Sequence, residues 1–212
     1  MRRRFFILLI VFTFGFIPLV KADSIPLKSR VAIQLSPLAF LDFNNGSSYR
    51  LGTQVLLTKK LAVSADFGGY FPNFSYMRKS KGFYSYFALK YRLPTHSRSW
   101  LSLSYSYKQQ YFEYHDVYIQ EPDVPIVVPV QKYVNCVSVN FEQDAALFRK
   151  GYINFYAGLG FRFRNVHSFE TKHQFDELKE GGDSQTLYLS LVPGKATWLN
   201  LNFGLRVGFY LF

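Results

Sequence analysis

The sequence is short of cysteine, of acidic residues and of long apolar runs. Cys136 is its one cysteine, which excludes a disulfide within the chain. Lysine and arginine total 25 against 14 acidic residues, for a formal net charge of +11. These cations are dispersed among turns and alternating positions, whereas a nucleic-acid binder would concentrate them in one patch or helix. A protein that binds nucleic acid is therefore not expected.

The one long apolar run lies at the N-terminus and is too short to span a bilayer. It covers residues 5–20, follows Arg2–Arg4, and precedes Val20-Lys21-Ala22. A transmembrane helix needs about 20 apolar residues, whereas a basic start, a short apolar segment and small residues before the cut are typical of a signal peptide. We predict export through the Sec pathway with cleavage after Ala22. Residues 1–22 would then be the signal peptide and residues 23–212 a single domain.

Aromatic residues are abundant, at 19% of the chain, and they recur in segments of strict alternation. The last stretch, Trp198–Phe212, places large apolar residues at every odd position from Leu199 to Leu211. Period-two alternation predicts a β-strand with one apolar face and one polar or small face. Seven earlier segments share the pattern: 31–36, 49–57, 61–68, 83–93, 101–108, 136–142 and 153–164.

These eight segments predict an all-β fold, an antiparallel up-and-down transmembrane β-barrel of about eight strands, with ten as the alternative. Connections after the second, fourth and sixth segments are short, and those after the third, fifth and seventh are longer. The longer ones include a basic loop at 72–82 and a loop or hairpin at 113–130. Leu187–Leu191 would make an odd strand count, so we assign it to an extension beyond the membrane.

The polar face of the predicted strands carries small residues and charges. A barrel of eight strands is just wide enough to be filled by side chains, so inward charges must pair, reach a mouth or hold water. We expect a salt-bridged interior, with an anion-selective lumen as the alternative. The predicted lumen charges are Arg50, Asp66, Lys90, Arg92, Lys108, Glu142, Arg162, Arg164 and Arg206.

The chain resembles the small outer-membrane β-barrel proteins of Gram-negative bacteria, and most nearly the uncharacterised barrel families of Bacteroidetes. The resemblance is carried by the signal peptide, the run LSPLAFLDFNNGSSYRLGTQVLLTKKLAVSADFGGYFP and the aromatic end. It implies a location in the cell outer membrane. It also implies that Phe212, with Tyr210 two residues earlier, is the signal read by the barrel-assembly machinery. Arg206 and Gly208 depart from that signal, because the family's positions there are usually apolar.

The sequence contains only a weak indication of a catalytic site. His115 lies in the second long connection, and His167-Ser168 with Glu170 begins the third. A Ser-His-Glu set can hydrolyse acyl bonds, but adjacent residues of a strand point to opposite faces. His115, His167 and His173 show no repeated ligand spacing, so neither a metal nor a cofactor is expected.

The sequence thus predicts a monomeric barrel with a structural, adhesive or interaction role, carried by extracellular loops over 114–130 and 166–183. Its expected partners are outer-membrane lipid, lipopolysaccharide, the barrel-assembly machinery and an unidentified extracellular partner. The alternatives are an outer-membrane hydrolase of lipid A or phospholipid, and a narrow channel.

Overall fold

A computed structural model describes residues 31–41, 47–72, 77–94, 98–119, 124–168, 178–180 and 194–211. The fold is all-β. Its elements are, in chain order, β1 (Val31–Leu35), the 3-10 helix η1 (Pro37–Leu41), β2 (Ser48–Leu56), β3 (Leu61–Tyr70), β4 (Met77–Arg92), β5 (Ser99–Ile119), β6 (Val124–Ala146), β7 (Gly151–Ser168), β8 (Leu178–Glu180) and β9 (Gly194–Tyr210). Among the described residues, no helix has the length and apolar character to cross a membrane.

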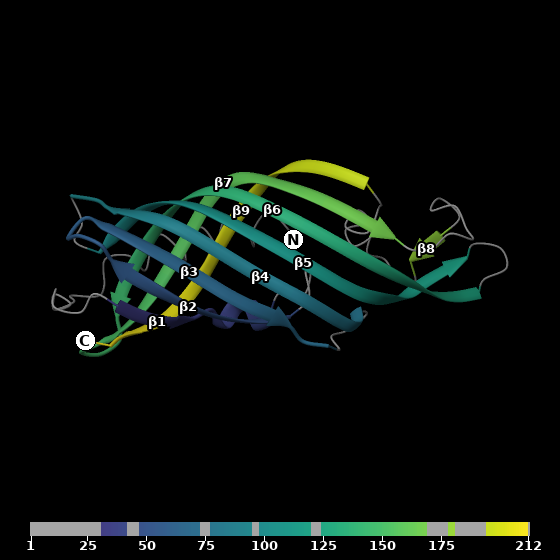
Figure 1. Ribbon diagram of the computed structural model, residues 1–212, viewed down its shortest axis with the longest axis horizontal. Coiled ribbons are helices and arrows are strands. Elements are labelled where there is room, and N and C mark those ends of the chain that lie inside the picture. Colours follow the sequence, from purple (N-terminus) through teal and green to yellow (C-terminus); the bar gives the residue numbers. More distant parts are fainter. Residues whose placement is uncertain are drawn as a thin grey trace, which may run out of the picture.

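Eight of the strands form a ring in which every neighbouring pair is antiparallel (Figure 1). Each strand pairs with the next along the chain, β7 pairs with β9, and β9 pairs with β1 and so joins the two ends of the sequence. The short β8 stands outside this ring and pairs only with the far end of β5 among the described residues. The prediction of about eight strands is therefore confirmed for the ring.

The strands are strongly tilted, as their register shows. Successive partners, followed from Gly208 to Gln34 and then around the ring, return to β9 ten residues away, at Trp198. A closed sheet with such a stagger has its strands inclined at about 35–45° to the axis. Paired residues carry numbers of the same parity, so even-numbered residues face inward around the ring, apart from exceptions near strand ends.

The two ends of the ring differ. Residues 57–60, 93–98 and 147–150 connect strands at the end where β9 finishes, and β5 and β6 extend well beyond the opposite end (Figure 1). The predicted alternation of short and longer connections is wrong after the third and fifth strands, because residues 71–76 and 120–123 are no longer than residues 93–98. The excursion at that end is made by β5 and β6 themselves, which continue as strands beyond the ring. Of the alternatives for residues 113–130, the hairpin is the one found, since β5 and β6 stay paired as far as Ile119 and Val124.

The predicted basic loop at 72–82 is wrong in part, because β4 already begins at Met77. The alternation was hidden by an irregularity: the register with β5 shifts between Arg78 and Lys81, and Lys79 has a positive φ of 52°. A bulge inserts an extra residue into a strand and breaks period two. Leu187–Leu191 and the proposed signal peptide lie outside the described residues.

Candidate functional site

The interior near the short connections is closed by aromatic side chains. Tyr152 and Tyr210 pack with ring centroids 5.0 Å apart, and both are buried. Trp100 is fully buried beside them, and its indole nitrogen donates to Asp144 Oδ2 at 2.7 Å. Ala32, Leu56 and Ala62 complete this cluster, named below the aromatic plug. The plug fills the interior at this end, whereas an open pore would hold water there.

Above the plug lies a layer of buried charges, defined here as the ionic layer: Asp66, Lys90, Glu142 and Arg206. Lys90 Nζ lies 2.7 Å from Glu142 Oε2, and Arg206 Nε lies 3.0 Å from Asp66 Oδ2. Arg206 Nη1 is also 3.7 Å from Glu142 Oε2, so that arginine links the two pairs. These residues come from β3, β4, β6 and β9, so the layer ties together strands on different sides of the ring.

Uncharged polar side chains add hydrogen bonds to the ionic layer. Gln34 Nε2 donates to Asp66 Oδ1 at 2.5 Å and to Ser64 Oγ at 2.7 Å. Lys90 Nζ donates to Gln54 Oε1 at 2.6 Å, and Ser102 Oγ donates to Glu142 Oε1 at 2.6 Å. Burying a charge is costly unless it is paired and hydrogen-bonded, and these contacts meet both conditions. This layer is therefore a cross-link that fills the interior.

Aromatic rings lie against the cations of the interior. The Arg206 guanidinium is 4.5 Å from the Tyr86 ring centroid and 4.3 Å from that of Tyr156, and Arg92 is 4.4 Å from Trp100. A cation over a ring face is attracted by the ring's quadrupole, more strongly where water is excluded. The tyrosines and the tryptophan therefore stabilise the buried positive charge alongside the carboxylates.

Towards the longer connections the described inward charges are basic. Arg50 lies 4.0 Å from the Tyr84 ring centroid, Lys108 Nζ lies 5.7 Å from the same ring, and Arg164 lies 4.5 Å from Trp198. Val134 of β6 is paired with Lys108 of β5 on one side and with Arg164 of β7 on the other. Lys132 is buried on the inner face of β6 as well. Arg162 occupies the inward position two residues before Arg164 and is half-buried.

Two members of the interior were missed by sequence reasoning. Asp144 and Lys132 are buried inward residues, but the predicted strand 136–142 ended before one and began after the other. Both have even numbers, so extending the alternation would have found them. The polar residues Gln34, Asn140 and Asn154 were expected on the polar face and lie there, but their part in the network was not predicted, because it depends on which strands face one another. Cys136 is buried and free, as expected of a small inward side chain.

The residues considered for catalysis are not assembled by the described structure. His167 is exposed on β7, and its ring contacts Tyr133 edge-on at 6.1 Å. His115 lies within β5, and Ser168 ends β7, but their side chains are outside what the structure describes. Glu170 and His173 lie outside the described residues. No group of three or more His, Cys, Asp or Glu suited to a metal ion occurs in the described part of the chain.

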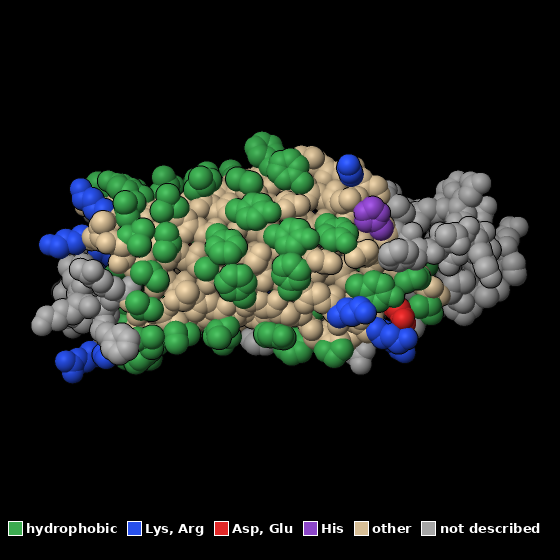
Figure 2. Space-filling model, in the orientation of Figure 1, with side chains coloured by type: hydrophobic (Ala, Val, Ile, Leu, Met, Phe, Trp, Pro, Cys, Tyr) green, Lys and Arg blue, Asp and Glu red, His purple; other side chains and the backbone are tan. Residues whose placement is uncertain are grey.

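The outer face of the ring is apolar over its middle. Leu199, Leu201 and Phe203 of β9 are 68%, 65% and 70% exposed, and large apolar side chains cover much of the visible face in Figure 2. Of the two predicted assembly residues, Tyr210 points inward into the plug, and Phe212 lies outside the described residues. Comparisons of the chain with protein-family models, curated proteins and solved structures find no match.

Proposed function

We propose that this chain is an integral outer-membrane β-barrel protein, monomeric and closed, that acts through interactions at its extended end. The observation that carries the proposal is the apolar outer face of a ring whose polar side chains point inward. Soluble monomers rarely expose contiguous apolar patches larger than a few hundred Å². In a membrane, by contrast, a closed ring satisfies every backbone group while lipid covers the apolar face.

The dimensions of the apolar face support a membrane setting. On β4 the exposed side chains from Phe83 to Tyr91 include Phe87 and Leu89, with Lys81 beyond one end. Eight residues at about 3.3 Å each, tilted by about 40°, cover roughly 20 Å of depth, close to the roughly 25 Å apolar band of such barrels. Phe83 and Tyr91 stand at its two ends, where interfacial aromatic residues are expected.

The extended end supports an interaction role. β5 and β6 continue beyond the ring as a hairpin, and β8 pairs with Val117, Tyr118 and Ile119 of β5 (Figure 1). Backbone pairing holds this extension together, so its surface side chains can vary in sequence without loss of the ring. We infer that the extension projects from the cell surface and binds the protein's partner.

The test combines assembly with binding on intact cells. Residues 114–127 are replaced by a short turn, and the control replaces Lys59-Lys60, in the connection at the other end, by Asn-Gly. Both variants should migrate faster on gels before boiling than after it, as a closed ladder keeps a barrel compact in detergent. Proximity labelling of surface neighbours should be lost only in the first variant. Identical mobility before and after boiling would contradict the barrel, and unchanged labelling would contradict the role of the hairpin.

The hydrolase alternative has its own measurement. A histidine acting as general base contributes about 10²–10⁴-fold to a rate, so its removal should alter the lipids the enzyme acts on. We expect His115→Ala, His167→Ala and Ser168→Ala to leave the lipid A and phospholipid mass spectra of cells unchanged. Loss of an acyl chain that depends on both the protein and His167 would establish the hydrolase.

A further inference from the structure

The outer wall of β4 carries an exposed basic group just beyond the apolar band. Its members are Arg78, Lys79 and Lys81, three cations within four residues, all exposed. Glu113 of β5 lies among them, with its Oε1 3.0 Å from Lys79 Nζ, so the group retains an excess of positive charge. Lys81 Nζ lies 4.8 Å from the ring centroid of Tyr111. We name these three residues the basic rim; Figure 2 shows Lys and Arg side chains gathered with one acidic side chain beside apolar ones towards the extended end.

The bulge of β4 is what gathers the three cations. Regular alternation would send one residue of each adjacent pair inward. The register shift between Arg78 and Lys81, with Lys79 in the left-handed region at φ 52°, leaves only Ser80 facing inward. Ser80 is held there, because its hydroxyl accepts from Gln110 Nε2 at 3.1 Å and its backbone nitrogen donates to Pro72 O at 2.7 Å. Bulges that re-aim side chains are often functional, and a left-handed non-glycine residue is a local strain kept by its surroundings.

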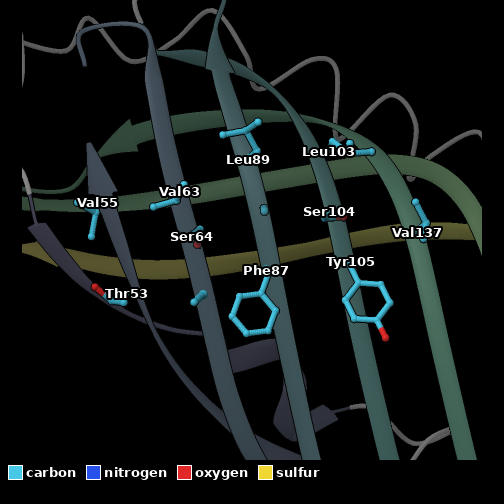
Figure 3. Close-up of a pocket in the computed structure, with 12 residues that line it drawn as sticks. Thr53, Val55, Val63, Ser64, Phe87, Leu89, Leu103, Ser104, Tyr105 and Val137 are labelled. Carbon is cyan, nitrogen blue, oxygen red and sulfur yellow. The ribbon is translucent and has the colours of Figure 1, made fainter. Parts of the chain in front are cut away.

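An apolar groove lies on the same wall. It has a volume of about 490 Å³ and crosses the outer faces of β2 to β6. Figure 3 shows Phe87 and Leu89 of β4 and Leu103 and Tyr105 of β5 beside it. Ala65 forms part of its lining, and this small side chain leaves room between the larger ones.

The basic rim and the groove are separated by the depth of one lipid leaflet. Phe87 is six residues from Lys81 along β4, which is about 20 Å along the strand and about 15 Å of depth at a tilt near 40°. The hydrocarbon core of a bilayer is about 30 Å thick, so one leaflet contributes about 15 Å. A lipid whose anionic headgroup sits on the rim can therefore lay an acyl chain in the groove.

We propose that this wall binds a phosphorylated glycolipid of the outer leaflet, lipid A, with its phosphate on Arg78, Lys79 and Lys81 and an acyl chain in the groove. Arginine and lysine form charge-assisted hydrogen bonds to phosphate oxygens, and the surface of the groove is mainly apolar. The proposal rests on the outer-membrane function above, because it needs the extended end to face the outer leaflet.

The test is native mass spectrometry of the folded protein in detergent with added diphosphoryl lipid A. The variant R78Q/K79Q/K81Q removes the rim, and K59Q/K60Q/R149Q removes the same charge from the exposed connections at the other end. We expect the rim variant to bind at least about tenfold more weakly, since each cation near an anionic lipid surface contributes appreciably, and the control to bind as the wild type does. Equal binding by the two variants would overturn the proposal.

Two further measurements separate the parts of the site. The first measures binding of dephosphorylated lipid A and of phosphatidylglycerol. If either lipid binds as tightly as diphosphoryl lipid A, the wall does not select this lipid and the proposal is overturned. Ala65→Trp should fill the groove and weaken binding several-fold, whereas Ala157→Trp, an exposed alanine on β7, should not. No difference between these two would exclude the groove as the acyl site. If the protein inserts into bilayers but binds all the lipids equally, and the variants do not differ, only the lipid A proposal is overturned. If the protein fails to insert into any bilayer, the proposed outer-membrane function is overturned as well.

Discussion

At the scale of single residues, the middle of the interior is organised by four buried charges, Asp66, Lys90, Glu142 and Arg206. The side chains of Lys90 and Glu142 are fully buried, and Arg206 contacts both Glu142 and Asp66. A buried ion pair contributes little more to the free energy of unfolding than an apolar pair of equal shape. Removing one partner, however, leaves the other charge buried and uncompensated. The ionic layer therefore enforces one arrangement of strands more than it adds net stability.

Glu142→Gln is the sharpest test of this layer, because it removes the negative charge and keeps the side-chain volume. Lys90 then loses its carboxylate at 2.7 Å, and we expect the free energy of unfolding to fall by about 3–5 kcal/mol. The matched control is Glu113→Gln, whose partner Lys79 is 72% exposed and whose loss should cost under about 1 kcal/mol. Guanidinium titration of the refolded protein measures both. Equal losses would show that burial of the layer does not matter.

At the scale of the strand, the face on which a residue lies decides its environment. Leu201 of β9 lies on the apolar outer face, whereas Leu57 is exposed in the connection between β2 and β3. An arginine on the lipid face costs about 2–4 kcal/mol at the middle of a bilayer and about 0–1 kcal/mol near its surface.

We therefore expect Leu201→Arg to destabilise the protein in lipid bilayers several-fold more than Leu57→Arg. Unfolding of bilayer-inserted protein by denaturant gives the two values. Because both variants replace an exposed leucine by arginine, a difference between them reports how deep each residue lies in the membrane. Equal values in the bilayer would mean that the outer face of β9 does not contact lipid.

Two prolines lie on one edge of the extended hairpin. Within the described part of the chain, residues 124–129 of β6 pair with β5 alone, because the register of β6 with β7 ends at Val130 and Ser168. Pro125 and Pro129 are four residues apart, so their nitrogens point to the same edge, and both stay paired with β5. Proline has no N–H, and exposed edges in natural proteins are often blunted this way.

Pro125→Val with Pro129→Val should restore two donors to this edge. We expect increased self-association of the detergent-solubilised protein, because an unpaired row of N–H and C=O groups is a template for another strand. Sedimentation velocity measures it, with Val127→Ile, between the two prolines on the same edge, as the control. A variant as monomeric as the wild type would show that the prolines do not guard the edge.

At the scale of the whole molecule, the interior is closed at one end and filled in its middle. The aromatic plug of Trp100, Tyr152 and Tyr210 lies below the ionic layer, and these side chains are buried. An eight-stranded ring has an interior that side chains can fill. We expect no ion conductance from the wild-type protein in planar bilayers.

Tyr152→Ala with Tyr210→Ala should remove most of the plug and admit water from that end. We expect at most brief, small current steps, since Lys90, Glu142 and Arg206 still fill the layer above. Steady anion-selective current from the wild type would contradict a closed interior and would favour the narrow-channel alternative. Gel mobility before and after boiling verifies that the protein in each recording is folded.

The sequence by itself determined the strands of the ring and their faces, because period-two alternation is a local property of each segment. It also placed most of the inward charges, from Arg50 on β2 to Arg206 on β9. It did not reveal the first residues of β4, where a bulge at Lys79 breaks the period. The inward positions Lys132 and Asp144 were lost because predicted strand ends were too short.

Only the tertiary structure decided which charges meet. Lys90 and Glu142 lie on non-adjacent strands, β4 and β6, and Arg206 is 140 residues from Asp66. Those contacts depend on the stagger of ten residues around the ring, which is a property of the closed sheet and of no single segment. The same holds for the basic rim and the groove below it: alternation places side chains on a face, but closure, tilt and the bulge determine what lies beside them.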